Sequence, residues 1–226
     1  MVRSLEELVD TADPSYPLIE RWVADASIAV TLLPVERRAA EATLLALQVT
    51  TRSGLGGLAF HTGGVLVDGG WLRVLGGGSP RLARSLVSWN QIGAPQVRMP
   101  GAMLVGDDAL GGVFAIDGGA FGNRDGKVWY MAPDTLEWEC LDMGHMDWLH
   151  WTLTGDLAGF YESMRWPGWE AEVAALTGDQ VISVYPPLWA AGASVAERKR
   201  AAVPVEEMWQ LQLDLRRQLA QSDAQA

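Results

Sequence analysis

Four short apolar runs in the middle of the chain constrain its fold more than any other feature. The runs are AMLVGD, GGVFAID, GKVWYMAP and LEWECLD, and they lie between residues 102 and 142. Two to about nine residues connect each run to the next. Parallel strands need crossovers of about a dozen residues or more, so connections this short predict an antiparallel meander.

Glycine pairs divide an earlier segment, SGLGGLAFHTGGVLVDGGWLRVLGGGSP, into short apolar runs. Runs of this kind predict strands joined by tight turns, and we place the strands near residues 57–61, 64–68 and 71–75. The next segment, residues 79–100, has no clear assignment, because RLARSLVSW fits either a short helix or a strand.

Helical patterns flank the strands on both sides. Near the start, SLEE predicts a capping box in which Ser4 caps the amide of Glu7 and Glu7 reaches back. VERRAAEATLLALQVT repeats apolar residues at helical spacing. After the strands, Pro167 and Gly168 divide a helical stretch. QVISVYPPLW is expected to be extended, and ERKR is expected to lie on a solvated helix face.

The last helix, PVEEMWQLQLDLRRQLAQ, has an apolar stripe formed by Met208, Leu211, Leu215 and Leu219. The order of helices, strands and helices predicts an α+β class, with a central antiparallel meander sheet flanked by N-terminal and C-terminal helices. No repeat or linker divides the sequence, so we expect residues 1–226 to form a single domain.

The cysteine content and the N-terminus indicate a reducing compartment. Cys140 is the only cysteine, so no intrachain disulfide can form, and we expect it to fill a core position in the sheet. The first residues, MVRSLEELVD, are acidic and lack the apolar core of a signal peptide. No apolar run reaches about 18 residues. We therefore expect a cytoplasmic protein that does not contact a membrane.

A net charge of −11 argues against nucleic acid as a partner, because a phosphate backbone would repel the chain. The charge is compatible with a protein partner that has a basic surface, through long-range steering. The eleven tryptophans predict an aromatic core where the sheet meets the helices. The alternatives are that some of them line a groove for a partner or bury the interface of a homo-oligomer.

The stretch DDALGGVFAIDGG suggests a metal or phosphate site, but its spacing favours a turn. The acids do not follow the pattern of a calcium loop, and the glycines lead into a strand rather than into a helix. We expect Asp107 and Asp108 to end one strand, Gly111 and Gly112 to make the turn, and DGGAFGNRDG to form a second hairpin loop. If a face of the protein binds a partner, we expect these exposed turns to form it, with Asp107, Asp108, Asp117, Asp125 and Trp148.

The sequence has no catalytic signature, such as a nucleophile elbow, a phosphate loop or a zinc helix. His145 and His150 are five positions apart, which sets them about 140° apart on a helix and does not suit a shared metal. We therefore expect no enzyme activity, no metal and no cofactor. The alternative is a small-ligand protein or an enzyme with a pocket beneath the glycine-rich turns. Its polar groups would be Asp108, Asp117, His145 and Glu162.

Several segments together resemble an uncharacterised bacterial family of unknown function over nearly the whole chain. They are TGGVLVDGGWLRVLGGGSPRL, LVGDDALGGVFAIDGGAFG, GKVWYMAPDTLEWECLDMGHMDWLHWTLTGDL and FYESMRWPGWEAEV. A more distant resemblance, over about residues 35–165, is to the SUKH superfamily, the Smi- and Knr-like immunity fold. HTGGVLV, GDDALGGVFAID and GHMDWLHWTLTGDL carry it, and residues 166–220 would be a C-terminal helical extension.

The SUKH resemblance implies a non-catalytic protein-binding module. Many bacterial SUKH proteins are similar to immunity proteins that bind and block a toxin, often a nuclease. An acidic surface could meet the basic cleft of such a nuclease.

Overall fold

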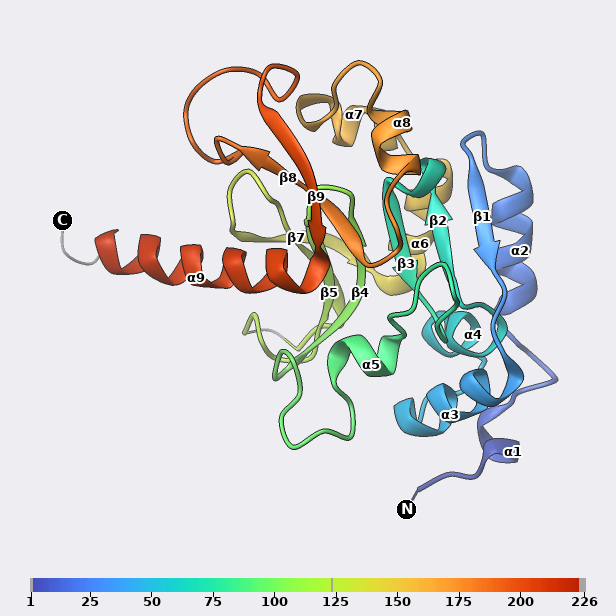
Figure 1. The fold of residues 1–226 in the computed structure, drawn as a ribbon. Coiled ribbons are helices and arrows are strands. Elements are labelled where there is room, and N and C mark those ends of the chain that lie inside the picture. Colours follow the sequence, from blue (N-terminus) through green and yellow to red (C-terminus); the bar gives the residue numbers. More distant parts are fainter. Residues whose placement is uncertain (1, 123, 224–226) are drawn as a thin grey trace.

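A computed structural model of the chain describes residues 2–122 and 124–223. Its main element is a seven-stranded antiparallel sheet in which the strands are neighbours in chain order, β1 to β7. A hairpin, β8–β9, forms a second small sheet, and helices flank the seven strands (Figure 1). The α+β class and the antiparallel meander predicted from the short connections are therefore confirmed.

The strands of the meander follow the apolar runs closely. Their bounds are β1 Val30–Leu33, β2 Gly64–Val67, β3 Leu72–Leu75, β4 Ala102–Asp108, β5 Val113–Asp117, β6 Lys127–Met131 and β7 Trp138–Gly144. The strands expected near 64–68 and 71–75 and the four central runs are confirmed. Strand β1 escaped prediction because it has only four residues and three of them are partly or fully exposed.

Most helices precede β2 or follow β7, and α5 lies between β3 and β4. Their bounds are α1 Leu5–Leu8, α2 Tyr16–Asp25, α3 Arg37–Leu47, α4 Gly54–His61, α5 Leu86–Asn90, α6 His145–Thr154, α7 Leu157–Phe160, α8 Trp169–Ala174 and α9 Val205–Asp223, with 3₁₀ turns η1 Asp68–Gly70 and η2 Glu162–Met164. The capping box at Ser4 and Glu7 is present. No helix in the described part of the chain has the length and apolar character needed to cross a membrane.

The strand expected at residues 57–61 is wrong, because this segment is helix α4. Ser53 caps the helix by accepting the Gly56 N–H at 3.1 Å. A Cβ on Gly56 would lie 2.1 Å from the Thr50 carbonyl oxygen, and one on Gly57 would lie 2.3 Å from Ser15 Oγ. These glycines therefore permit close packing of a helix, whereas glycine usually marks a turn between strands.

The unassigned segment 79–100 contains the short helix α5. Ser85 and Ser88 form a capping box at its start. At its end, the buried Asn90 side chain donates to Leu104 O and accepts from Leu104 N, at 2.8 and 2.7 Å. These two bonds attach α5 to strand β4.

The hairpin of β8 (Gln180–Tyr185) and β9 (Lys199–Pro204) corrects two expectations about the C-terminal part. The extended state of QVISVY is confirmed, but ERKR does not lie on a helix, since Lys199 and Arg200 begin β9. Residues 166–220 are thus not a purely helical extension. Arg200 is held in the strand because its guanidinium packs 4.5 Å from the Trp166 ring and pairs with Glu172 at 3.1 Å.

The two faces of the main sheet pack against different elements. Gly106 and Asp107 are adjacent on β4, so they point to opposite faces. A Cβ on Gly106 would lie 3.1 Å from Trp148 of α6, which places α6 on that face, together with α2 and α4 that contact it. Asp107 points to the other face, toward the segment that leads into β8, while the far half of α9 projects beyond the sheets (Figure 1).

Candidate functional site

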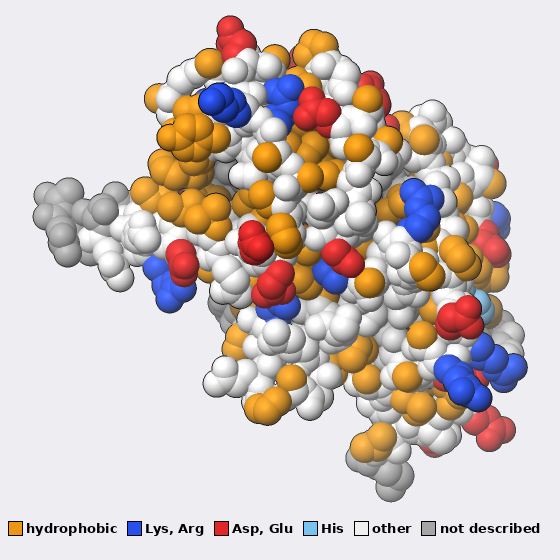
Figure 2. Space-filling view, viewed as in Figure 1, with side chains coloured by type: hydrophobic (Ala, Val, Ile, Leu, Met, Phe, Trp, Pro, Cys, Tyr) orange, Lys and Arg blue, Asp and Glu red, His pale blue; other side chains and the backbone are white. Residues whose placement is uncertain are grey.

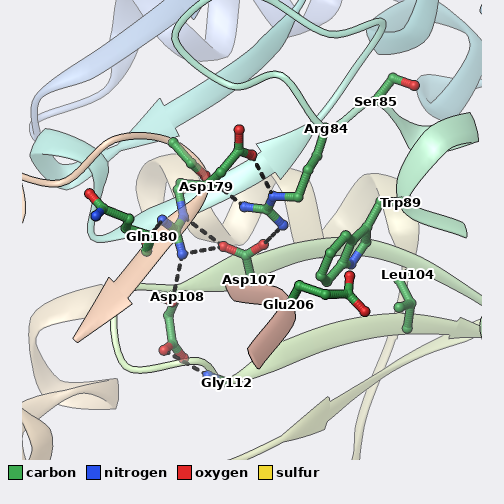
Figure 3. A network of polar contacts seen from close by, with 12 residues as sticks. Arg84, Ser85, Trp89, Leu104, Asp107, Asp108, Gly112, Asp179, Gln180 and Glu206 are labelled. Carbon is green, nitrogen blue, oxygen red and sulfur yellow. Dashed lines mark hydrogen bonds and ion pairs between the residues drawn. The ribbon is translucent and has the colours of Figure 1, made fainter. Parts of the chain in front are cut away.

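Asp107 lies fully buried between two arginine side chains (Figure 3). Arg73 of β3 donates from Nε to Asp107 Oδ1 at 2.6 Å, and Arg84 donates from Nη1 to Oδ2 at 2.5 Å. Burial alone would raise the pKa of Asp107, but the two guanidinium groups hold it below its ordinary value. The carboxylate is therefore ionised and fully occupied by this chain.

The same arginines connect the sheet to the segment before β8. Arg84 Nε donates to Asp179 Oδ1 at 3.0 Å, and its Nη2 donates to the Gly178 carbonyl at 2.8 Å. Arg73 Nη1 donates to the Gln180 carbonyl at 2.5 Å. This ionic network joins segments about 100 residues apart in the chain, so its role is to hold the C-terminal part on the sheet.

Asp108, also fully buried, closes the turn between β4 and β5. Its Oδ1 accepts the backbone N–H groups of Leu110 and Gly112 at 2.9 Å, and its Oδ2 accepts the hydroxyl of Tyr130 at 2.6 Å and of Tyr161 at 3.3 Å. Burial raises its pKa above the ordinary value, although these donors favour the charged form. A Cβ on Gly112 would lie 2.1 Å from Oδ2. The expected turn is thus confirmed, and only glycine fits it.

Asp117 organises the second hairpin loop, as the sequence predicted for DGGAFGNRDG. Its oxygens accept three backbone N–H groups, from Gly119, Phe121 and Arg124, at 2.8 to 3.2 Å. Burial opposes ionisation, yet these donors lower the pKa of Asp117 below its ordinary value. Asp117 is 2% exposed, whereas Asp125 in the same loop is exposed.

Four of the five residues expected on an exposed partner-binding face are buried, so their expected exposure is wrong. Asp107, Asp108 and Asp117 are buried and serve as acceptors within the chain, and Trp148 has no exposed surface. Asp125 alone of the five is exposed. The aspartates were placed in turns correctly, but arginine, tyrosine and backbone donors from distant segments cover them.

The residues of the alternative pocket do not meet. Asp108 and Asp117 lie in the two separate turns, His145 begins α6, and Glu162 is exposed in η2. A cavity of about 230 Å³ does lie beneath the glycine turn at 68–70, but none of these four residues lines it. In the described residues, no group of three or more His, Cys, Asp and Glu side chains is placed to hold a metal.

The aromatic core predicted from the tryptophans is present. Trp71, Trp148 and Trp166 are buried; the Trp71 ring lies 5.0 Å from that of Trp169, and the Trp148 ring 5.1 Å from that of Phe114. Cys140, by contrast, is only half-buried on the edge strand β7. The core position expected for this cysteine is wrong.

An exposed apolar surface lies where the segment after β8 meets α9. Four large hydrophobic residues there are exposed: Tyr185 (70%), Trp189 (37%), Leu211 (49%) and Leu219 (40%). A groove of about 130 Å³, lined mostly by apolar side chains that include Leu188 and Leu215, runs between Tyr185, Trp189 and Leu211. Figure 2 shows hydrophobic side chains gathered at this place. We call Tyr185, Trp189, Leu211, Leu215 and Leu219 the C-terminal surface.

The apolar stripe expected on the last helix is only partly buried. Met208 is buried at 8% exposure, so the stripe does start in the core. Leu211 and Leu219 are exposed because α9 continues past the body of the protein (Figure 1). The sequence predicts the apolar stripe, but it does not predict the residue at which α9 extends beyond the rest of the fold.

Comparison with known proteins places this fold in a family. Residues 5–208 match the family described as "Protein of unknown function DUF2625". The chain belongs to this family. The resemblance to an uncharacterised family that the glycine-rich segments indicated is thereby confirmed. The DUF2625 match ends at Met208, within the first turns of α9.

Two relatives are similar over nearly their whole length. The uncharacterised protein YbfG of Escherichia coli (strain K12) is 40% identical over 220 residues, which cover 97% of this chain and 100% of the relative. An uncharacterised protein of Haemophilus influenzae is 32% identical over 212 residues, or 92% and 93% of the two chains. No solved structure matches the chain, so the SUKH resemblance stays a prediction.

An acidic stretch of this DUF2625 member was overlooked in the sequence. Residues 128–164 contain no lysine or arginine, but they contain seven acids: Asp134, Glu137, Glu139, Asp142, Asp147, Asp156 and Glu162. All of these except the half-buried Asp134 are exposed, on and around β7 and α6. Counting basic residues in a sliding window would have found this stretch.

His145 is the perturbed histidine of this region. Its Nε2 is buried without a hydrogen-bond partner, next to the Trp148 ring at 5.7 Å. Burial lowers the pKa of His145 from 6.5 to about 4, because the charged imidazolium would lose its hydration. His145 is therefore a neutral packing residue of α6 at physiological pH.

Stability is expected to fall as the pH drops from about 6.5 to about 4. In this range the unfolded chain binds a proton at His145 and the folded chain does not, so acid favours unfolding. The full shift corresponds to roughly 3 kcal/mol. Urea unfolding at neutral and acidic pH should show this loss in the wild type and a smaller loss in His145→Gln. The exposed His150, changed to Gln, is the control; equal pH dependence in wild type and His145→Gln would contradict the assignment.

Proposed function

We propose that this chain is a non-catalytic protein-binding module whose partner has a basic surface. The observation that carries the proposal is the C-terminal surface. Large exposed hydrophobic side chains that lie together mark interaction sites more often than scattered ones do. Here three such side chains, Tyr185, Trp189 and Leu211, gather around one groove.

The composition of this surface suits a binding hot spot. Tryptophan and tyrosine are enriched among the residues that contribute most to protein–protein affinity. Tyr185 at the end of β8 and Trp189 in the segment after it both line the groove. Leu211 and Leu215 line the same groove from α9. A partner side chain that entered it would be removed from water on both sides.

The charge distribution supports a basic partner. The net charge of −11 and the exposed acids of residues 128–164 would attract a basic protein over long range. The apolar groove would then supply the short-range contacts, a division that is common in protein complexes. A basic nuclease toxin, the partner class that the SUKH resemblance implies, has the required charge.

A non-catalytic role is supported by how the chain uses its central carboxylates. Asp107 accepts a hydrogen bond from each of two arginines, and Asp108 and Asp117 each accept three or more from donors of the same chain. Carboxylates held in this way stabilise turns and the sheet. They are not placed to exchange protons with a substrate.

The test compares two leucines of similar exposure. Leu211 is 49% exposed on the C-terminal surface, and Leu45 is 39% exposed on α3. Immobilised wild type, Leu211→Asp and Leu45→Asp would be incubated with lysate of the source organism, and the retained protein identified, purified and titrated. Leu211→Asp is expected to weaken binding by about 30-fold or more, and Leu45→Asp is expected to bind as wild type does.

Three outcomes would decide against this proposal. Equal affinity of the partner for both variants would exclude the C-terminal surface as the site. A retained protein with a net negative charge would exclude long-range attraction of a basic partner. So would a partner whose association rate does not change with salt concentration. Sedimentation equilibrium of the wild type alone covers the remaining case: a dimer that Leu211→Asp dissociates would show that a second copy occupies the surface.

A further inference from the structure

The cavity beneath the glycine turn is separate from the C-terminal surface. It has a volume of about 230 Å³ and lies between the β2–β3 turn, Pro80 and Arg81, and the segment from Val173 to Gly178. Drug-sized ligands occupy pockets of roughly 300–1,000 Å³. The cavity therefore has room for a small ion or a small metabolite.

The charges around this cavity differ from those of the rest of the chain. Its lining contains Arg73 and Arg81 and no acidic residue, although the chain as a whole has a net charge of −11. Arg81 is exposed and has no ion-pair partner among the described residues. Arg73 lies at the inner wall with a side chain 3% exposed. The cavity is thus a local basic site in an acidic protein.

Behind the cavity, two buried guanidinium groups contact the same carboxylate. Arg73 and Arg84 share one fully buried carboxylate, that of Asp107. The second acid of the network, Asp179, lies on the Arg84 side with 46% of its side chain exposed. Burial lowers the pKa of Arg73, although the charges of Asp107 and Asp108 oppose this shift.

Arg73 has a donor to spare. Its Nε and Nη2 point to Asp107 and to the Asp108 carbonyl, and Nη1 donates one hydrogen to the Gln180 carbonyl. A guanidinium has five N–H groups, and the second Nη1 hydrogen has no acceptor within residues 2–122 and 124–223. An anion near Arg73 would accept it.

The glycine turn leaves the wall of the cavity bare. Asp68, Gly69 and Gly70 all have positive φ, of 52°, 68° and 101°. A Cβ on Gly69 would have nothing within 4 Å, and one on Gly70 would meet only Val173 at 3.9 Å. The backbone conformation therefore requires glycine here, and its consequence is open space beside the two arginines.

We propose that this cavity binds a small anion through a carboxylate or phosphate group, held by Arg81 at the rim and Arg73 at the inner wall. Guanidinium groups bind both oxyanions in two-point contact. The proposal does not depend on the protein-binding role, because the lining of the cavity and the residues of the C-terminal surface do not overlap.

Calorimetric titration with inorganic phosphate and with succinate, at constant ionic strength set by chloride, tests the proposal and separates the two oxyanions. At least one of them is expected to saturate the wild type. Arg81→Ala is expected to weaken that binding about tenfold or more. The control Arg38→Ala removes an equally exposed positive charge on α3 and is expected to change nothing.

A second variant fills the cavity instead of changing its charge. Ala174 is exposed and lines the cavity, so Ala174→Trp is expected to abolish binding while the fold, followed by circular dichroism, stays intact. Absence of saturable binding by phosphate and by succinate would overturn the proposal. So would equal weakening by Arg81→Ala and Arg38→Ala, because the effect would then come from net charge alone.

Discussion

Replacing Asp107 with asparagine is expected to destabilise the protein by about 3–5 kcal/mol, the cost of breaking a buried ion pair from one side. The substitution keeps the size of the side chain, but it leaves Arg73 and Arg84 buried without the carboxylate that they share. Domains of this kind are stable by about 5–15 kcal/mol. The substitution would therefore remove a large part of the free energy of unfolding. Urea unfolding would show a lower midpoint concentration and an unchanged denaturant slope.

Asp125→Asn is the matched control, because it removes the same charge from an exposed turn. Its effect is expected to stay within about 0.5 kcal/mol. A loss below about 1 kcal/mol for Asp107→Asn would show that the two arginines find other acceptors, and the account of the ionic network would then be wrong.

The second large effect is expected for Trp148→Ala, at about 3–5 kcal/mol. Trp148 has no exposed surface, and its ring lies against Gly106 and the Phe114 ring. Truncation would leave a cavity between α6 and the sheet that the rigid strands cannot fill. Urea unfolding of the variant measures this loss directly.

Trp189→Ala separates the two roles that tryptophan has in this chain. Trp189 is 37% exposed on the C-terminal surface, so its loss is expected to change stability by no more than about 0.5 kcal/mol. The same variant should weaken partner binding, which Trp148→Ala affects only through unfolding. A stability loss in Trp189→Ala as large as that in Trp148→Ala would contradict the assignment of Trp189 to an interface.

The meander was predictable because connection length is a local property. Two to about nine residues cannot cross a sheet, so the strands from Ala102 to Gly144 had to be antiparallel neighbours. Helix α4 was not predictable in this way. Glycine is common in turns, so its presence favoured turns in this segment. In the structure, Thr50 and Ser15 pack so close to these glycines that a Cβ would clash with them. Tertiary packing decided the structure of that segment.

The location of the aspartates was predictable, but their exposure was not. Sequence spacing places Asp107 and Asp108 at the end of a strand, where polar residues are usually solvated. The partners that bury them lie far along the chain: Arg73 is 34 positions from Asp107, and Tyr161 is 53 positions from Asp108. No single-sequence pattern reports pairings over such separations.

The C-terminal surface shows the opposite case. The sequence predicts an apolar stripe from Met208 to Leu219, but it does not show how much of the stripe is buried. Only the structure shows that the body of the protein ends beneath the middle of α9, so that Met208 is buried while Leu219 is 40% exposed. How far a helix extends past the residues that it packs against depends on the tertiary structure of the rest of the protein.

The ionic network also has a consequence for how the molecule unfolds. Arg73 and Arg84 belong to the N-terminal half, yet the carbonyls of Gly178 and Gln180 occupy part of their donors. Detaching the C-terminal hairpin and α9 would therefore expose unsatisfied cations inside the sheet, not merely remove an appendage. The two halves should lose their structure in one cooperative step, and a shortened chain that ends before residue 178 should be insoluble rather than a smaller folded version of the whole.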